Sequence, residues 1–290
     1  MTYLQYEKRF SDHTLKAYRT DLEQLASFLT EVYGVCDWLG LSAAQLRTWM
    51  AALSEEGQEP ATIRRKLSAV KSFFRFWRKQ MSGLQDPTKG IQTPKLKKRM
   101  PVTVDVTSLS YLLASFPVED DFSIARDKLI LELLYGVGLR RSELLALTEA
   151  DIAPQEMRLK VMGKGGKERL LPYGAAVAKA LERYIGYKRQ LFPAINLLIC
   201  TDKGNAPCPK WLYNKVKQYL GTVPHLERAS PHVLRHSFAT HLSDAGADLN
   251  AVKELLGHTS LAATQVYTHN SIEKLKRAYS QAHPKARMDE

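Results

Sequence analysis

The chain has 290 residues, of which 44% are hydrophobic and 25% are charged, and its formal net charge is +12. This composition is typical of a globular protein of one large or two ordinary domains. No apolar run approaches the ~18 residues of a membrane span, the first ten residues are too charged for a signal peptide, and the three cysteines form no disulfide framework. We expect a cytoplasmic protein whose excess positive charge favours a polyanionic partner.

The first hundred residues are predicted to be helical. Ser11 or Thr14 is the candidate N-cap of a helix whose apolar residues at 15–29 recur every three or four positions. A second helix is predicted around 46–53, and a third opens at Pro60.

The third predicted helix, ATIRRKLSAVKSFFRFWRK, contains seven cations and no acidic residue. Its apolar residues form one stripe, so the helix can bury one side and present positive charge from another. A solvated surface is the alternative, but cations without an anion repel one another unless something neutralises them. We therefore predict that this helix follows a phosphate backbone, with four candidate DNA contacts: Arg64, Arg65, Lys71 and Arg75.

Two prolines bracket a basic segment, TPKLKKRMP. Proline interrupts helices, so we predict a linker at 95–101 between an N-terminal domain, 1–94, and a C-terminal domain, 102–290. The linker adds three candidate DNA contacts, although a plain solvated linker would have the same composition: Lys97, Lys98 and Arg99.

The remainder is predicted to be mainly α-helical with a small antiparallel β-sheet. Two strand-like runs, 158–162 and 168–172, flank the glycine-rich turn GKGGK and predict a hairpin. Helices are expected at 107–116, 122–135, 142–147, from 174 through 184, 211–220, 231–245 and 249–256.

Side chains suited to phosphate chemistry recur along this second part. GLRRSEL places Arg140 at the start of a helix, where a guanidinium and free amides suit a phosphate, although Arg140 could simply pair with Glu143. GKGGK places Lys164 at the hairpin tip, where an ordinary lysine-rich turn is the alternative. SPHVLRH places His232 and Arg235 on one helix face.

A last pair of segments, LLGH and TQVYTH, adds His258 and Tyr267. Each is usually a packing residue by itself, but the whole set could break a phosphodiester without metal, because guanidinium groups neutralise oxygens, an acid protonates the leaving alkoxide and a phenol attacks. A zinc site at His232 and His236 is disfavoured, since Arg235 lies between them and would repel a dication.

In this order, GLRRSEL, GKGGKER, SPHVLRHSFATHL, LLGH and TQVYTH resemble the motifs of the tyrosine recombinase (phage integrase) family, and most those of its bacterial Xer subgroup. The resemblance covers essentially the whole chain, because HTLKAYRTDL and the cationic helix are similar to the family's core-binding domain. It implies a SAM-like helical core-binding domain and a catalytic domain that form a C-shaped clamp around duplex DNA.

The resemblance also implies a role for each candidate residue. Arg140 and Arg235 would bind the non-bridging oxygens of the scissile phosphate, and Lys164 would protonate the 5′-hydroxyl leaving group. His232 would assist proton transfer, and His258 would donate a hydrogen bond to a phosphate oxygen.

Tyr267 would be the nucleophile and form a 3′-phosphotyrosyl link, so no metal, ATP or other cofactor is expected. Relatives act as tetramers on two DNA sites, which implies a homotetramer or a heterotetramer with a paralogous recombinase, with a DNA translocase as a candidate activator. The tail 277–290 could be exchanged between protomers, although a frayed end would have the same sequence character.

Resolution of chromosome dimers at cell division is the predicted role, because the chain starts almost directly with the core-binding helices. The integrase of a mobile element, which would have the same chemistry, remains the alternative. Two further alternatives are a type IB topoisomerase and a DNA-binding module without activity; the second is disfavoured because all six site positions are filled.

Overall fold

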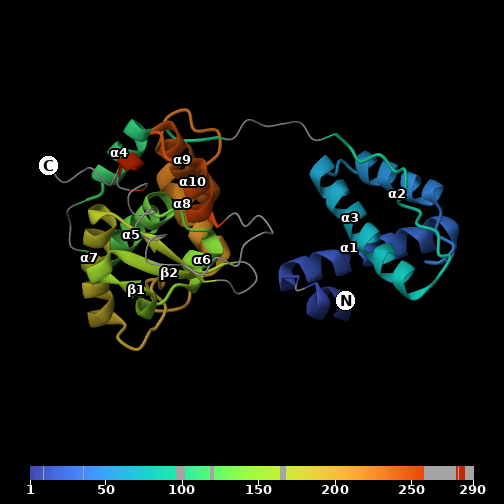
Figure 1. The fold of residues 1–290 in the computed structure, drawn as a ribbon, viewed down its shortest axis with the longest axis horizontal. Helices are drawn as coiled ribbons and strands as arrows, with labels where there is room; N and C mark the ends of the chain where they lie inside the picture. The colour runs from blue at the N-terminus through green and yellow to red at the C-terminus, as the bar shows by residue number, and fades with distance from the viewer. Residues whose placement is uncertain are drawn as a thin grey trace. The chain divides into compact units, whose positions relative to one another are not determined.

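The computed structural model describes residues 1–8, 10–34, 36–95, 102–117, 121–163, 168–257, 279 and 281–284. Within it the chain divides into two units, Met1–Arg99 and Met100–Glu290, each with its own buried hydrophobic cluster. Figure 1 labels the helices and strands of both. Across the described ranges, no helix has the length and apolar character needed to cross a bilayer.

The first unit is helical, as the sequence predicts. Its elements are the π-helix η1 (Tyr3–Glu7), α1 (Asp12–Tyr33), α2 (Ala43–Glu55) and α3 (Pro60–Gln80). Ser11 rather than Thr14 caps α1, because its hydroxyl accepts a hydrogen bond from the Thr14 backbone N–H at 3.4 Å. Pro60 lies in the first turn of α3, where its missing N–H costs nothing.

Apolar stripes on α1, α2 and α3 meet in the core of the first unit. On α3 the buried residues Ile63, Leu67, Val70 and Phe74 follow the predicted spacing of three and four, and Trp49 of α2 packs with them. With that stripe buried, the rest of the α3 circumference carries most of its cations.

The second unit is built from seven α-helices and a small sheet within its described residues. In chain order these are α4 (Val106–Ala114), α5 (Phe122–Gly136), α6 (Arg141–Ala146), the 3-10 helix η2 (Glu149–Asp151), β1 (Ile152–Ala153), the 3-10 helix η3 (Pro154–Glu156), β2 (Arg158–Met162), β3 (Glu168–Pro172), α7 (Ala175–Leu191), α8 (Pro209–Leu220), α9 (Pro231–Asp244) and α10 (Leu249–Leu256). The predicted helices are confirmed, with most ends shifted by one or two residues, whereas α7 continues past 184 to Leu191.

The sheet is antiparallel and has the order β1-β2-β3. Strands β2 and β3 form the predicted hairpin, in which Leu159 lies opposite Leu171. The edge strand β1 was not predicted, since two residues carry no periodicity, and it pairs Ile152 with Leu159. Side chains of Leu159 and Leu171 are buried in the same cluster as the helices, which ties the hairpin to the core.

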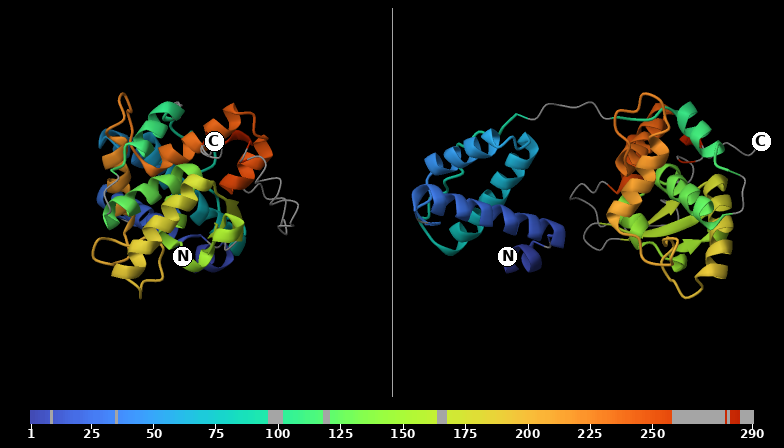
Figure 2. Two further views of the ribbon diagram at one scale, coloured as in Figure 1. Left: turned by 90° about the vertical axis from the view of Figure 1, so that its left-hand side faces the viewer. Right: turned by 180° about the vertical axis from the view of Figure 1, so that it is seen from behind.

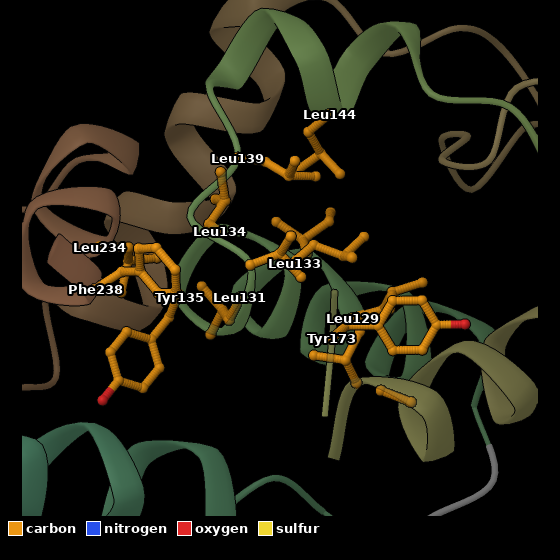
Figure 3. Packing of buried hydrophobic residues seen from close by; sticks show 14 of the residues in the cluster. Leu129, Leu131, Leu133, Leu134, Tyr135, Leu139, Leu144, Tyr173, Leu234 and Phe238 are labelled. Carbon is orange, nitrogen blue, oxygen red and sulfur yellow. The ribbon is translucent and has the colours of Figure 1, made fainter. Parts of the chain in front are cut away.

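Helix α5 is the centre of the second unit. It is buried around nearly its whole circumference, and its buried residues include the charged Arg126, Asp127 and Glu132 as well as apolar ones. Helices α4, α6, α7, α8 and α9 all pack against it. Figure 3 shows Leu234 and Phe238 of α9 beside Tyr135, with Leu139 and Leu144 further along toward α6. Figure 2 shows the unit from two further directions.

A short C-terminal piece also belongs to this core. Tyr279 and His283 are buried and their rings stack with centroids 4.9 Å apart. His283 in turn contacts Tyr135 at 5.1 Å and Phe238 at 5.2 Å between centroids. This piece therefore packs against both α5 and α9, next to the helices that lead into the candidate site.

Candidate active site

The turn between α5 and α6 carries the first predicted site residue, and a glycine fixes its path. Gly138 has φ +69°, and a Cβ there would lie 2.5 Å from Cδ1 of Phe238 on α9. Only glycine adopts this conformation without strain and leaves room for the ring. The neighbouring Leu139 is fully buried, so the turn is pressed against α9 just before Arg140.

Arg140 lies at the N-cap of α6 and its side chain is 30% exposed. Its backbone N–H donates to Oε2 of Glu143 at 2.8 Å, and its Nη1 donates to Oε1 of the same carboxylate at 2.7 Å. Its Nη2 donates to the Gly257 carbonyl at 2.9 Å. The pairing with Glu143 that the sequence left open is thus present, and the guanidinium still reaches the surface.

Arg235 of α9 is buried, and it joins two distant segments. Its Nη1 donates to the Gly138 carbonyl and its Nη2 donates to the Leu256 carbonyl. Burial and then the positive charge of Arg140 lower the pKa of Arg235 to about 10, so the group is charged at neutral pH. An anion bound between the two arginines would offset the repulsion between their positive charges.

The C-terminus of α10 brings the two arginines together. Consecutive carbonyls, those of Leu256 and Gly257, accept from Arg235 and Arg140 respectively. The last carbonyls of a helix have no partner within it and form the negative end of its dipole, which suits cations. The structure therefore places the guanidinium groups of Arg140 and Arg235 side by side at one helix end.

A third guanidinium, that of Arg169 on β3, was missed by the sequence interpretation. Its Nη1 and Nη2 donate to the two oxygens of Glu143 at 2.8 and 2.9 Å. A signal was available: period two along β3 puts Arg169 on the same buried face as Leu171, where a charge requires a partner. Burial raises the pKa of Glu143, but hydrogen bonds from Arg169 and Arg140 outweigh it and hold the pKa below its ordinary value.

Of the other predicted site residues, one lies in the described part of the chain. His232 is exposed in the first turn of α9, three residues before Arg235 and hence on a neighbouring part of the helix surface. Lys164, His258 and Tyr267 lie outside the described residues. In the sequence, Lys164 falls between β2 and β3, and His258 follows Gly257 directly.

In the first unit, α3 carries the predicted DNA contacts on two sides. Arg64 and Arg75 are exposed and Lys71 is half-buried, and their spacing of seven and four puts them on one stripe. Arg65 instead points toward α1 and forms an ion pair with the buried Asp21. The candidate contacts of the linker, Lys97, Lys98 and Arg99, lie outside the described residues.

The picture of α3 as a helix of unneutralised cations needs a correction. Lys66 is 3% exposed, donates to the side chain of Gln24 and lies 3.6 Å from Asp21. Asp21 therefore neutralises part of the charge from the neighbouring helix, which helix-by-helix counting overlooked. An open groove of about 280 Å³ runs here between α1 and α3, lined by His13, Lys16, Ala17, Thr20, Asp21, Gln24, Arg65 and Lys66.

Comparison with known proteins identifies the family of this chain. The chain matches the phage integrase family over residues 113–274 and the SAM-like N-terminal domain of phage integrases over residues 1–81. Tyrosine recombinase XerC of Chlorobaculum parvum is 37% identical over 314 residues, which covers 99% of this chain and 93% of that protein.

Two solved structures share the fold. XerH recombinase bound to its difH substrate before cleavage has a TM-score of 0.62 at 27% identity, over 83% of this chain and 70% of that one. The Tn1549 transposon integrase in complex with transposon right end DNA has a TM-score of 0.73 at 19% identity, over 94% of this chain and 96% of that one.

The chain belongs to the phage integrase family, that is, to the tyrosine recombinases. It is an Xer-like site-specific DNA recombinase, with an N-terminal SAM-like domain and an integrase catalytic domain.

Proposed function

We propose that this recombinase cuts and rejoins double-stranded DNA at the point where Arg140 and Arg235 meet, with Tyr267 as the nucleophile. The observation that carries the proposal is the placement of both guanidinium groups on consecutive carbonyls at the end of α10. Two forked cations fixed in this way can neutralise the non-bridging oxygens of one phosphate as charge develops on them.

The proposed step is an in-line displacement at phosphorus. The Tyr267 phenolate forms a bond to phosphorus, the bond to O5′ breaks, and a 3′-phosphotyrosyl link results. Lys164 gives a proton to the departing O5′, His232 assists proton transfer and His258 donates a hydrogen bond to a phosphate oxygen. A tyrosine of pKa about 10 needs positive neighbours to ionise at neutral pH, and the arginines would supply them.

Reversal of this step joins strands. The free 5′-hydroxyl of a partner strand attacks the phosphotyrosyl bond, Tyr267 leaves, and a phosphodiester forms again. The proposed cycle consumes no ATP because the bond energy is retained in the enzyme–DNA link, and it draws on no bound metal or cofactor.

The active unit would be a tetramer on two DNA sites, homomeric or shared with a paralogous recombinase, activated in the cell by a DNA translocase.

We propose that the exposed cations of α3 hold the DNA backbone during this reaction. Arg64, Lys71 and Arg75 follow one stripe of the helix, which suits successive phosphates rather than a single base. Arg65 and Lys16 line the adjacent groove and would extend the contact. Lys97, Lys98 and Arg99 would continue it along the linker.

The biological role proposed is the resolution of chromosome dimers in the cytoplasm at cell division. The support is full-length similarity to XerC at 37% identity. The integrase of a mobile element remains the second candidate, because the Tn1549 transposon integrase has the same fold. Sequencing the DNA that becomes covalently attached in cells distinguishes them: a single chromosomal site supports the Xer role, and the ends of an element support the other.

The chemistry is tested with nicked suicide DNA, which loses a short fragment on cleavage and so traps the intermediate. The wild-type protein should form a covalent complex that resists denaturation and is released by a protease. Tyr267→Phe should bind the same DNA and form no complex. A covalent complex in that variant would refute the assignment of the nucleophile.

A further inference from the structure

Glu143 is the shared partner of two arginines with different surroundings. Its carboxylate accepts four hydrogen bonds, two from Arg140 and two from Arg169, so that each oxygen accepts two. The side chain of Arg140 is 30% exposed, whereas that of Arg169 is 5% exposed. The exposed arginine can reach a ligand, while the buried one faces its carboxylate.

The geometry points to a role for Arg169 that goes beyond packing and rests on the proposed function. We propose that Arg169 is a positioning residue: by holding Glu143 in a two-pronged ion pair, it fixes the carboxylate that orients Arg140 toward the scissile phosphate. A planar guanidinium is required, because only a fork holds both carboxylate oxygens at once.

Charge balance supports this role. A buried carboxylate with one cation pairs with it strongly, since the local dielectric is low. Without Arg169, the Glu143 carboxylate would pair with Arg140 alone. This stronger ion pair would compete with the scissile phosphate for the Arg140 guanidinium. With Arg169 present, the three guanidinium groups and one carboxylate leave an excess of two positive charges at the site.

The end of α10 is shaped around the same pair. Gly257 has φ +61°, and a Cβ there would lie 2.9 Å from Nη1 of Arg169 and 3.3 Å from Nη1 of Arg140. Both guanidinium groups therefore fit against one glycine, whose carbonyl accepts from Arg140. A displacement of Arg169 would therefore also change the packing of the Arg140 guanidinium against Gly257.

The test measures single-turnover cleavage of suicide DNA by the full-length protein. Arg169→Met should cleave ~30–100-fold more slowly than wild type. Arg169→Lys, which keeps the charge but loses the fork, should cleave about tenfold more slowly. Both losses are smaller than the ~10²–10³-fold loss of a direct transition-state contact, because Arg169 acts through Arg140. DNA affinity should stay within about threefold of wild type, because the buried Arg169 side chain makes no contact with the DNA backbone. The matched control is Arg158→Met on the neighbouring strand β2, where Arg158 pairs with the exposed Glu156 and cleavage should change less than about twofold.

A double-mutant cycle separates positioning from general damage. If Arg169 acts through Arg140, then Arg169→Met should slow cleavage by less than about threefold when Arg140 is already alanine. An equal loss in both backgrounds, or wild-type cleavage by Arg169→Met, overturns the proposal. Circular dichroism and thermal melting establish folding, and if Arg169→Met does not fold, Arg169→Lys carries the same cycle.

Failure of this inference is distinguishable from failure of the proposed function. Absence of a covalent complex in the wild-type protein, or its presence in Tyr267→Phe, would remove the recombination chemistry itself. Normal wild-type cleavage together with an unaffected Arg169→Met variant would remove only the positioning role.

Discussion

The molecule carries arginines in two very different settings. In the second unit, Arg169 and Arg235 are buried, and among the described residues their guanidinium groups donate to the Glu143 carboxylate and to the Gly138 and Leu256 carbonyls respectively. On α3 in the first unit, Arg64 and Arg75 are exposed to solvent. The same side chain is thus held in place at one site and left free to adapt at the other.

This difference suits two functions: stabilisation of the transition state at the first site and binding of the DNA backbone at the second. Neutralising a developing charge requires donors that are in place before the reaction, because reorganisation would add to the barrier. Holding a phosphate backbone requires only charge at about the right spacing, and it is screened by salt. We therefore expect substitutions at the two sites to change different measured quantities.

The largest effect is expected from Arg235→Ala. Removing the buried guanidinium should slow DNA cleavage by about 10²–10³-fold, as for other groups that stabilise a transition state. DNA affinity should change little, because most of it comes from backbone contacts elsewhere. Cleavage rates and binding isotherms measured on the same DNA check this, with Arg235→Lys as the charge-preserving control. Equal losses of binding and cleavage would argue for a purely structural role.

The next effect concerns the turn that supports these arginines. Gly138→Ala should lower the free energy of unfolding by about 2–4 kcal/mol, because a left-handed backbone and contact with the Phe238 ring both oppose the new methyl group. Gly246→Ala is the matched control, since Gly246 has φ +85° with nothing within 4 Å of the new Cβ, and only the left-handed backbone cost of about 1–2 kcal/mol applies. Thermal unfolding of both variants tests this; identical losses would show that Phe238 does not require the glycine.

A smaller effect is expected on α3. Arg75→Ala should weaken DNA binding and reduce the slope of log K against log salt by about 0.9, the amount for one lost phosphate contact. Arg65→Ala should reduce the slope less, because Arg65 is already paired with Asp21. Titrations at several salt concentrations measure both. A larger change from Arg65 would reverse the assignment of which side of α3 faces DNA.

The smallest effect is a pH dependence of stability at His241. Burial lowers the pKa of His241, a shift only partly offset by its hydrogen bond to the Val104 backbone and by the charges of Asp244 and Asp105. The unfolded chain therefore takes up a proton as pH falls below ~6.5 while the folded chain resists it, so the stabilisation is complete above that pH and is lost toward acid.

Thermal unfolding between pH 7.5 and 5 should show this loss, at most about 1.4 kcal/mol per pH unit for one proton. His241→Gln should flatten the dependence, and substitution of the exposed His13 should not. An unchanged slope in His241→Gln would assign the acid sensitivity to other groups.

Much of the fold followed from local patterns. The stripe Ile63–Phe74 and the GKGGK turn predicted α3 and the β2–β3 hairpin, because periodicity and glycine act within a few residues. The strand β1 was missed because its two residues are held only by pairing with β2. Likewise, the partial neutralisation of the α3 cations by Asp21 depends on how α1 and α3 pack, and the sequence of either helix alone does not show this packing.

The candidate site was predicted in part. Chemistry singled out Arg140 and Arg235, and the structure brings them together at α10. Arg169 was overlooked because a charged residue in a strand is usually assigned to the solvent face. The carbonyls of Leu256 and Gly257 could not be predicted at all, since every residue has a carbonyl and only the tertiary fold selects two of them.

The cluster of three guanidinium groups around one carboxylate has a thermodynamic consequence for the resting enzyme. Like charges confined in a poorly solvated space oppose folding, so the DNA-free protein is the form in which this repulsion is greatest. Any oxyanion that settles between the arginines removes it, and by mass action raises the melting temperature as its concentration grows. Sulfate or tungstate should therefore act as a stabilising additive for the isolated enzyme, and the rise in melting temperature would report how fully the oxyanion occupies the position proposed for the scissile phosphate.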